Sequence, residues 1–252
     1  MARRRRYNRK RRRGSFAFLY KLLAFVLICG AIGLALAMFF KIEDIEISGN
    51  SRYTNQQITA AAEIRVGDNL FFLNKYDAAA RIRRQLPYVE TVQFRRVLPN
   101  KLVVQVTECQ DPVAIKQDGT VYLLCDKGTI VDTVSAAKWS QYIQIEGLTL
   151  LDPQVGAEAR AAATQQSVLE RLLTILTLLD DKGMLHQVQV IDLSDAARIT
   201  VRYMDRFDVQ FLWDADFDYK LDYLAAVADK LEDNEKGTID MTQEGKASFI
   251  PS

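Results

Sequence analysis

Histidine is almost missing from the 252-residue sequence, which contains only His186 together with three cysteines, five prolines and twelve glycines. One histidine leaves little material for a catalytic triad or a zinc site, and no Gly-x-Ser-x-Gly elbow supports a triad. The scattered glycines form neither a P-loop nor a dinucleotide fingerprint. The sequence therefore predicts that the protein is not an enzyme and has no cofactor, metal site or small-molecule substrate.

The residues closest to a chemical site are His186 and an acidic run. His186 follows a predicted helix end, where a lone histidine is usually a capping or surface group. Asp214, Asp216, Asp218 and Asp222 lead into a predicted helix, and negative charge is favourable at a helix N-terminus. We expect the acidic run to cap this helix; a weak cation site is the alternative.

Acidic residues are also missing from the first 42 positions, whereas residues 1–13 contain nine basic ones. From residue 41 onward, 23 basic residues stand against all 32 acidic ones, which makes a net charge of −9. Between these parts, Leu22–Phe40 has no charged residue and would span roughly 28 Å as a helix, close to the thickness of a bilayer. The pattern predicts a basic tail at 1–15 and a single transmembrane helix at 16–40.

The basic residues favour one orientation of this helix. Arg11, Arg12 and Arg13 precede the predicted helix and Lys21 lies about one turn inside it, so the positive-inside rule places the N-terminus in the cytoplasm. The alternative is a cleaved signal peptide, because Ala35-Leu36-Ala37 has the small-x-small pattern of a cleavage site. Topology and contact with anionic lipid explain the basic tail, so we expect no nucleic-acid partner.

Residues 41–108 predict a compact unit of order β-α-α-β-β. Apolar alternation indicates a first strand through Ile47, and two helices follow, one capped by Thr54 and one that ends before Pro87. Two strands then follow, separated by a turn at Leu98-Pro99-Asn100.

This order resembles the POTRA domain, a small extracytoplasmic module. The likeness is carried by Ile45-Glu46-Ile47-Ser48-Gly49-Asn50, Gly67-Asp68-Asn69-Leu70-Phe71, Leu86-Pro87-Tyr88-Val89-Glu90-Thr91-Val92 and Arg95-Arg96-Val97-Leu98-Pro99-Asn100-Lys101-Leu102. The Gly-Asn turn and the hairpin that ends Pro-Asn-x-Leu are the most specific parts.

Residues 109–242 predict a second domain of mixed type. A hairpin turns at Gln117-Asp118-Gly119, an amphipathic helix is expected at 158–182, and strands follow at 188–193, 199–203 and 207–213. A helix at about 218–233 and a short strand at 238–242 complete it, with 243–252 as a C-terminal tail. Cys109 and Cys125 lie 16 residues apart, and a disulfide and two buried free thiols both remain open.

The whole order resembles the FtsQ/DivIB family of bacterial cell division proteins. Thr107-Glu108-Cys109-Gln110-Asp111-Pro112-Val113-Ala114 is similar to the family's Glu-x-x-x-Pro-x-Ala segment, with Cys109 where an arginine is common. Phe217-Asp218-Tyr219-Lys220-Leu221 and Gly237-Thr238-Ile239-Asp240-Met241 match the family's Lys-Leu and Ile-Asp positions. The resemblance implies an α+β fold: a single N-terminal transmembrane helix, a POTRA domain at 41–108, and a mixed α/β "β-domain" at 109–242 that ends in a short edge strand.

The resemblance also implies partners. Members of this family bind the membrane proteins FtsB (DivIC in Gram-positive bacteria) and FtsL with the C-terminal part of the β-domain. An unpaired strand edge can accept a strand from a partner, and Thr238–Thr242 is the best candidate edge because little chain follows it. The alternative is that residues 243–252 fold back over it. The expected partner-binding residues are Phe211, Trp213, Tyr223, Gly237, Thr238, Ile239, Asp240, Met241 and Thr242. For Trp213 and Tyr223, which would be aromatic anchors, a place in the core is the alternative.

The sequence thus predicts a membrane scaffold of the divisome at the division septum, which helps to control septal peptidoglycan synthesis. One alternative is another POTRA-containing envelope assembly or secretion protein, and a second is a membrane-anchored cell-wall hydrolase. If Thr238–Thr242 is the edge, a proline at Ile239 or at Asp240 removes an N–H from one side of the strand or the other.

Overall fold

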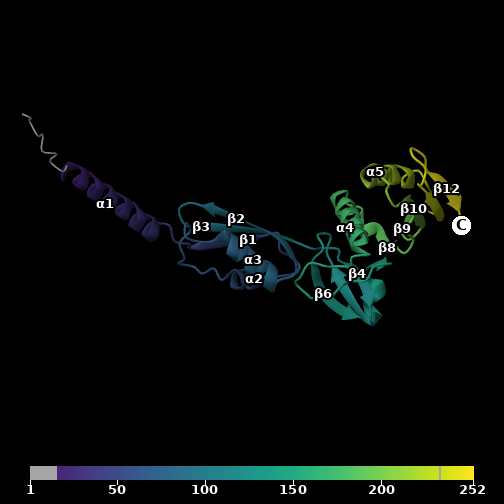
Figure 1. The fold of residues 1–252 in the computed structure, drawn as a ribbon, viewed down its shortest axis with the longest axis horizontal. Coiled ribbons are helices and arrows are strands. Elements are labelled where there is room, and N and C mark those ends of the chain that lie inside the picture. The colour runs from purple at the N-terminus through teal and green to yellow at the C-terminus, as the bar shows by residue number, and fades with distance from the viewer. Residues whose placement is uncertain (1–15, 233) are drawn as a thin grey trace, which may run out of the picture. The chain divides into compact units, whose positions relative to one another are not determined.

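A computed structural model of the chain describes residues 16–232 and 234–252 (Figure 1). Its first element is the 24-residue helix α1, Phe16–Phe39, which is apolar on all sides. Among the described residues, α1 is the one helix long and apolar enough to cross a membrane. This confirms the expected apolar helix. Lys21 is exposed on α1, whereas Arg11, Arg12 and Arg13 lie outside the described residues.

The β-α-α-β-β order is confirmed. Its elements are β1 (Asp44–Ser48), α2 (Asn55–Ala62), α3 (Lys75–Gln85), β2 (Val89–Val97) and β3 (Lys101–Glu108). The three strands form one sheet in the order β1-β3-β2.

Local signals set the ends of these helices. The Thr54 hydroxyl accepts a hydrogen bond from the Gln57 N–H, and the Gln57 side chain accepts one from the Thr54 N–H, which completes a capping box. The Asn74 side chain accepts hydrogen bonds from the N–H groups of Tyr76 and Asp77 and so caps α3. Short-range hydrogen bonds thus set where both helices begin.

The C-terminal domain is built on a nine-stranded sheet. Its strands are β4 (Val113–Gln117), β5 (Thr120–Leu124), β6 (Ile130–Ser135), β7 (Ile143–Glu146), β8 (Val188–Asp192), β9 (Arg198–Tyr203), β10 (Phe207–Leu212), β11 (Gly237–Asp240) and β12 (Ser248–Pro251). Their order in the sheet is β12-β11-β10-β9-β8-β7-β4-β5-β6. Consecutive hairpins make most neighbours antiparallel, but β4–β7, β7–β8 and β10–β11 are parallel pairs.

Helices α4 (Gln166–Asp181) and α5 (Phe217–Ala228) contact each other and cover one face of this sheet (Figure 1). Two short 3₁₀ helices, η1 (Ala136–Gln141) and η2 (Leu185–Gln187), complete the domain. The main core combines apolar side chains from both helices and from the covered face of the strands, including Leu172, Ile175, Leu221, Leu224, Val201, Phe207, Val209 and Ile239.

Helix α4 is shorter than the amphipathic pattern predicts, because it begins at Gln166 and not at 158. The backbone just before it is used elsewhere: the carbonyl of Ala157 accepts from the Ile130 N–H at 2.9 Å, and the Ala159 N–H donates to the Gly128 carbonyl at 2.7 Å. These bonds pair the segment with the start of β6, a strand that the sequence analysis did not predict.

The disulfide that the sequence left open is formed between Cys109 and Cys125, with an Sγ–Sγ distance of 2.04 Å. Both cysteines belong to a second, smaller core that also contains Tyr88, Ala114 and Leu123. Glu90 brings a carboxylate oxygen within 4.8 Å of the two sulfurs, the one such group of three potential metal ligands among the described residues. Because the sulfurs are bonded to each other, they offer no thiolate to a metal ion.

Contacts divide the chain into two compact units. One contains α1 and the rest of the described chain up to Glu46, together with Arg65–Leu73 and Arg96–Val103. The other contains Ile47–Ile64, Asn74–Arg95 and Val104–Ser252.

Candidate partner-binding edge

The end of the nine-stranded sheet differs from the prediction. Strand β11 is not an edge, because it pairs in parallel with β10 and in antiparallel with β12. The prediction that Thr238–Thr242 forms the edge was therefore wrong, and the alternative, in which residues 243–252 fold back, is confirmed. Gly237 makes this close approach possible, since a Cβ atom there would lie 2.2 Å from the carbonyl oxygen of Ile250.

Because β11 lies inside the sheet, the expected effect of the two proline substitutions changes. Both neighbours of β11 use its backbone groups, and the Met241 N–H also donates to the Gln210 carbonyl at 2.9 Å. A proline at Ile239 or at Asp240 would therefore break pairing inside the domain in either case.

Three of the expected partner-binding side chains are in the core. Phe211, Ile239 and Met241 have no exposed surface, and the Phe211 ring lies 4.9 Å from that of Phe217 in α5. A partner cannot reach these side chains while the sheet is intact. Their contribution is to hold β10 and β11 against the helices.

The other expected residues are partly accessible. Gly237, Thr238, Asp240 and Thr242 are half-buried along and just after β11. The Asp240 carboxylate accepts from the Thr242 hydroxyl at 2.7 Å and from the Thr242 N–H at 2.9 Å. These hydrogen bonds lower the pKa of Asp240 below its ordinary value, so the carboxylate stays charged and fixes the turn that leaves β11.

The two aromatic candidates lie near α5. Trp213 is half-buried, and its carbonyl oxygen accepts from the Arg171 guanidinium. The half-buried Tyr223 ring stacks on Tyr219 with centroids 6.2 Å apart. Both rings therefore lie at the boundary between core and surface.

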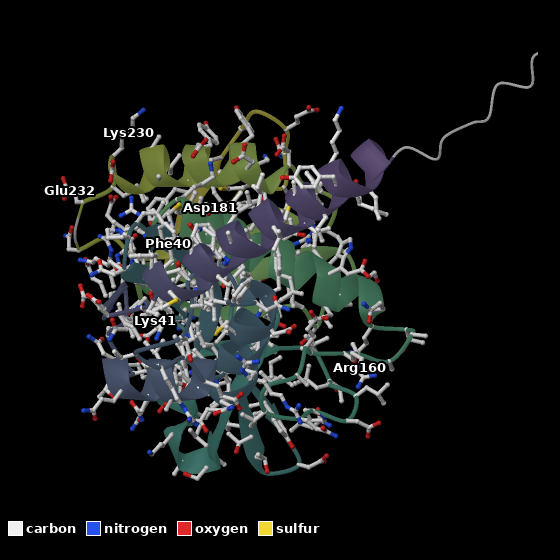
Figure 2. All side chains as sticks on the ribbon, turned by 90° about the vertical axis from the view of Figure 1, so that its left-hand side faces the viewer. Phe40, Lys41, Arg160, Asp181, Lys230 and Glu232 are labelled. Carbon is white, nitrogen blue, oxygen red and sulfur yellow. A yellow bond between two sulfur atoms is a disulfide. The ribbon has the colours of Figure 1, made fainter. Side chains whose placement is uncertain are left out.

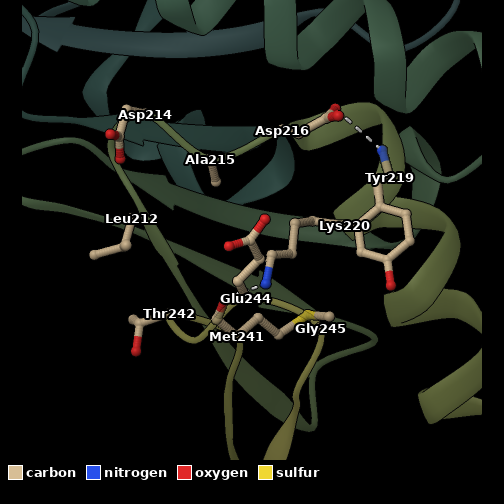
Figure 3. A pocket seen from close by; sticks show the side chains of 10 residues that line it. All are labelled: Leu212, Asp214, Ala215, Asp216, Tyr219, Lys220, Met241, Thr242, Glu244 and Gly245. Atoms are coloured by element: carbon tan, nitrogen blue, oxygen red, sulfur yellow. Dashed lines mark hydrogen bonds between the residues drawn. The ribbon is translucent and has the colours of Figure 1, made fainter.

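A buried lysine holds the turn between β11 and β12 in place. Lys220 projects from α5, and its ammonium group donates to the Met241 carbonyl at 2.8 Å (Figure 3). It also donates to the Gln243 carbonyl at 2.6 Å. The side chain is only 6% exposed, so these two carbonyls replace most of its water. In the sequence, Lys220 stood out only as part of the family's Lys-Leu position. The sequence did contain one signal for its burial: Lys220 lies on the same helix face as Phe217, Leu221 and Leu224, which are core residues.

A cavity of about 730 Å³ opens beside this lysine (Figure 3). It is lined by Leu212, Asp214, Ala215, Asp216, Tyr219, Lys220, Met241, Thr242, Glu244 and Gly245. The lining combines apolar side chains with three carboxylates, the Lys220 ammonium group and two hydroxyl groups, and among these residues no nucleophile is paired with a base.

Within the described residues, the edge of the sheet at this end is β12. The Ser252 N–H donates inward to the Lys236 carbonyl at 3.0 Å. In an antiparallel strand, the N–H and C=O groups of one residue point to the same side, and this side alternates from residue to residue. The backbone N–H and C=O groups of Ile250 therefore point inward, toward β11, and those of Phe249 point outward. Pro251 points outward without an N–H to offer.

The outward backbone of β12 is therefore short. It presents the N–H and C=O of Phe249 and the C=O of Pro251, while the Phe249 ring packs against Phe207 with centroids 6.0 Å apart. This strand was not predicted, because its four residues show no apolar alternation and therefore carry little strand signal in the sequence.

The acidic run has structural roles. Asp216 caps α5 by accepting from the Tyr219 N–H, as predicted. Asp218 and Asp222 both pair with the ammonium group of Lys182, at 2.7 Å and 2.6 Å. His186 is exposed at the surface of η2.

Two family models match adjacent parts of the chain. One, described as POTRA domain, FtsQ-type, matches residues 40–108, and the other, described as Cell division protein FtsQ/DivIB, C-terminal, matches residues 113–242. The chain belongs to the FtsQ/DivIB family of cell division proteins. The resemblance predicted from the sequence is thus confirmed.

Individual relatives of the chain are also named DivIB or FtsQ. Cell division protein DivIB of Clostridium botulinum (strain Hall) is 27% identical over 220 residues, which covers 84% of this chain and 82% of the relative. Cell division protein FtsQ of Geotalea daltonii is 29% identical over 196 residues, covering 77% and 69%. DivIB of Clostridium tetani is 23% identical over 186 residues, covering 73% and 68%. Membership of this family supports a role in the divisome.

The structure also explains the Glu108 position of the FtsQ/DivIB motif. Glu108 is 4% exposed, and its carboxylate accepts hydrogen bonds from the backbone N–H groups of Ser51, Arg52 and Tyr53 and from the Ser51 hydroxyl, at 2.7 to 3.2 Å. Glu108 therefore fixes the loop before α2. Cys109, which replaces the common arginine, forms the disulfide.

Proposed function

We propose that this protein is a non-enzymatic scaffold of the divisome that recruits FtsB/DivIC-like and FtsL partners to the division septum. Helix α1 holds it in the cytoplasmic membrane, the basic tail lies in the cytoplasm, and the folded domains lie outside. Through these partners it helps to control septal peptidoglycan synthesis. Family membership supports the divisome role, and the charge asymmetry around the apolar helix supports the orientation.

The observation that carries the proposal is the outer edge of β12. A partner strand laid along it would bond to the N–H and C=O of Phe249, which is the mode of strand addition. Pro251 ends the donor side of this edge, so the added strand is short. A few hydrogen bonds, each of about 0.5–1.5 kcal/mol net, suffice when both partners are anchored in one membrane and their effective concentration is high.

The experiment tests the outward N–H directly. Tagged full-length protein is purified from the source bacterium in mild detergent, and the co-purified small single-span partners are quantified for wild type, Phe249→Pro and Phe249→Ala. Phe249→Ala is the matched control, because it removes the same ring but keeps the N–H.

We expect Phe249→Pro to retain about fivefold less partner than Phe249→Ala, which corresponds to one lost hydrogen bond. Melting curves of the two variants should agree, since the missing N–H points away from β11. Equal recovery of partners by the two variants contradicts binding through the β12 edge.

A further inference from the structure

Four large apolar side chains of the POTRA domain are exposed to solvent near the end of α1. Val66, Phe72 and Leu98 are 69%, 70% and 57% exposed, and Phe71 is 41% exposed. We call Val66, Phe71, Phe72 and Leu98 the membrane-proximal patch. They come from two segments that belong to the same compact unit as α1: Arg65–Leu73, and Arg96–Val103, which is the β2–β3 turn with the strand residues on either side of it. We call these segments the first and the second loop.

The first loop is joined directly to the last turn of α1. The Asn69 side chain donates to the Leu36 carbonyl at 2.8 Å, and the Leu70 N–H donates to the Phe40 carbonyl at 2.9 Å. The Phe71 ring lies 5.1 Å from the Phe40 ring, edge to face. Figure 2 labels Phe40 and Lys41 at this end of the purple helix.

The second loop is hydrogen-bonded to the residues that follow α1. The N–H groups of Glu43 and Asp44 donate to the Asn100 carbonyl at 2.8 Å and 3.3 Å. The Arg96 guanidinium lies 6.0 Å from the Phe71 ring centre and donates to the Leu73 carbonyl at 3.1 Å. Both loops are therefore held to the chain as it leaves the helix.

These bonds determine the depth of the patch relative to the bilayer. Leu36 belongs to the apolar run that ends at Phe40, and four residues of helix rise about 6 Å. Asn69 thus lies level with the last turn of the membrane-spanning segment. Interfacial segments bury their apolar side about 5–10 Å into the boundary between headgroups and acyl chains, which the neighbouring phenylalanines reach.

Charge at this point agrees with a lipid surface. Lys41 and Arg65 are exposed and Arg96 lies beside the Phe71 ring, so cations flank the apolar side chains. Aromatic rings bordered by cationic groups are typical of a segment that lies in the interface of a membrane with anionic lipid.

We propose that the membrane-proximal patch inserts into the phospholipid leaflet at which α1 ends, as a second, peripheral contact of the POTRA domain with the membrane. The proposal rests on the retention of α1 as an anchor, as in the proposed function. The consequence is that these two loops are held at the lipid surface and are not available to a protein partner.

The test places tryptophan at single positions of the full-length protein in vesicles of phosphatidylethanolamine and phosphatidylglycerol. The vesicles are made with and without bromine on the acyl chains near the headgroups, because bromine quenches only nearby tryptophan. Phe72→Trp and Val66→Trp probe the patch. Glu46→Trp is the control, because Glu46 is exposed on β1 in the same unit and does not belong to either loop of the patch. Wild type supplies the background of Trp139 and Trp213.

We expect bromine to quench Phe72→Trp and Val66→Trp roughly twofold more than Glu46→Trp, with a blue-shifted emission on reconstitution. Equal quenching at all three positions, in protein that floats with the vesicles, overturns the proposed insertion of the patch but is consistent with α1 as the membrane anchor. Full-length protein that does not float with the vesicles overturns the anchor and the patch together. A second variant, Phe72→Asp with Val66→Trp, should lose the quenching of the tryptophan.

Discussion

Replacement of Glu108 by glutamine should destabilise the loop before α2 by about 2–3 kcal/mol. One carboxylate oxygen accepts three of the four hydrogen bonds, from the Ser51 N–H and hydroxyl and from the Arg52 N–H, and the other accepts from the Tyr53 N–H at 3.2 Å. Glutamine can keep its oxygen toward the three donors, but its amide nitrogen then faces the Tyr53 N–H. One bond is lost and three lose their charge assistance, and hydrogen bonds to charged groups contribute about 1.5–3 kcal/mol.

The assay combines thermal unfolding in mild detergent with amide hydrogen exchange at residues 51–53. Faster exchange of the Arg52 amide reports local opening, and a lower melting temperature reports any global effect. Glu63→Gln is the control, because the Glu63 side chain is 65% exposed and pairs with Arg81 at 3.4 Å, so about 0.5 kcal/mol or less is expected. If Glu108→Gln matches Glu63→Gln in both measurements, the carboxylate does not hold this loop.

The pH dependence gives an independent check. Burial raises the pKa of Glu108, but hydrogen bonds from Arg52 and Ser51 outweigh it and leave the pKa below its ordinary value of 4.5. The stabilisation is therefore complete above pH 4.5 and is lost as the pH falls through the lowered pKa. Protection of the Arg52 amide should fall in that acidic range in wild type and show no such step in Glu108→Gln.

Two further predictions concern the region around the disulfide. The Cys109–Cys125 bridge closes a loop with a sequence separation of 16, so its removal in a double serine variant should cost about 3 kcal/mol; equal melting temperatures of oxidised wild type and variant would contradict this. Burial, with a hydrogen bond to Asp126, raises the pKa of Glu90 to about 7 despite the Lys127 ammonium at 2.9 Å. The folded state thus holds the proton more tightly than the unfolded state, and stability should decrease as the pH rises from 4.5 to about 7. Melting temperatures measured across this range should fall in wild type, and Glu90→Gln should remove that slope.

Much of the POTRA domain could be predicted because its signals are local. Thr54 and Gln57 are three residues apart, and alternation of apolar residues marks each strand within a few positions. The same holds for the α5 cap at Asp216 and for the hairpin of β9 and β10, whose turn and alternation lie close together in the chain.

The candidate site was predicted less completely, since it depends on contacts between distant residues. The expected binding residues Ile239 and Met241 are buried in a sheet that continues past β11, because β12 pairs with β11. No local pattern in the sequence predicts this pairing. Lys220 was missed as a structural residue because its partners are backbone carbonyls more than twenty positions away, at Met241 and Gln243. A backbone carbonyl is present at every position and leaves no trace in the sequence.

Composition and periodicity were enough to establish the apolar helix and the β-α-α-β-β order of the POTRA domain, because each depends on side-chain character along neighbouring positions. The family followed from the resemblance of short motifs, which are also local. Which strand forms the edge, whether Cys109 and Cys125 meet, and which loops lie beside the end of α1 depended on the tertiary structure. These features arise when segments far apart in the chain pair or pack. The free energy of such pairing depends on all the segments that meet in the folded protein, so it cannot be estimated from one segment alone.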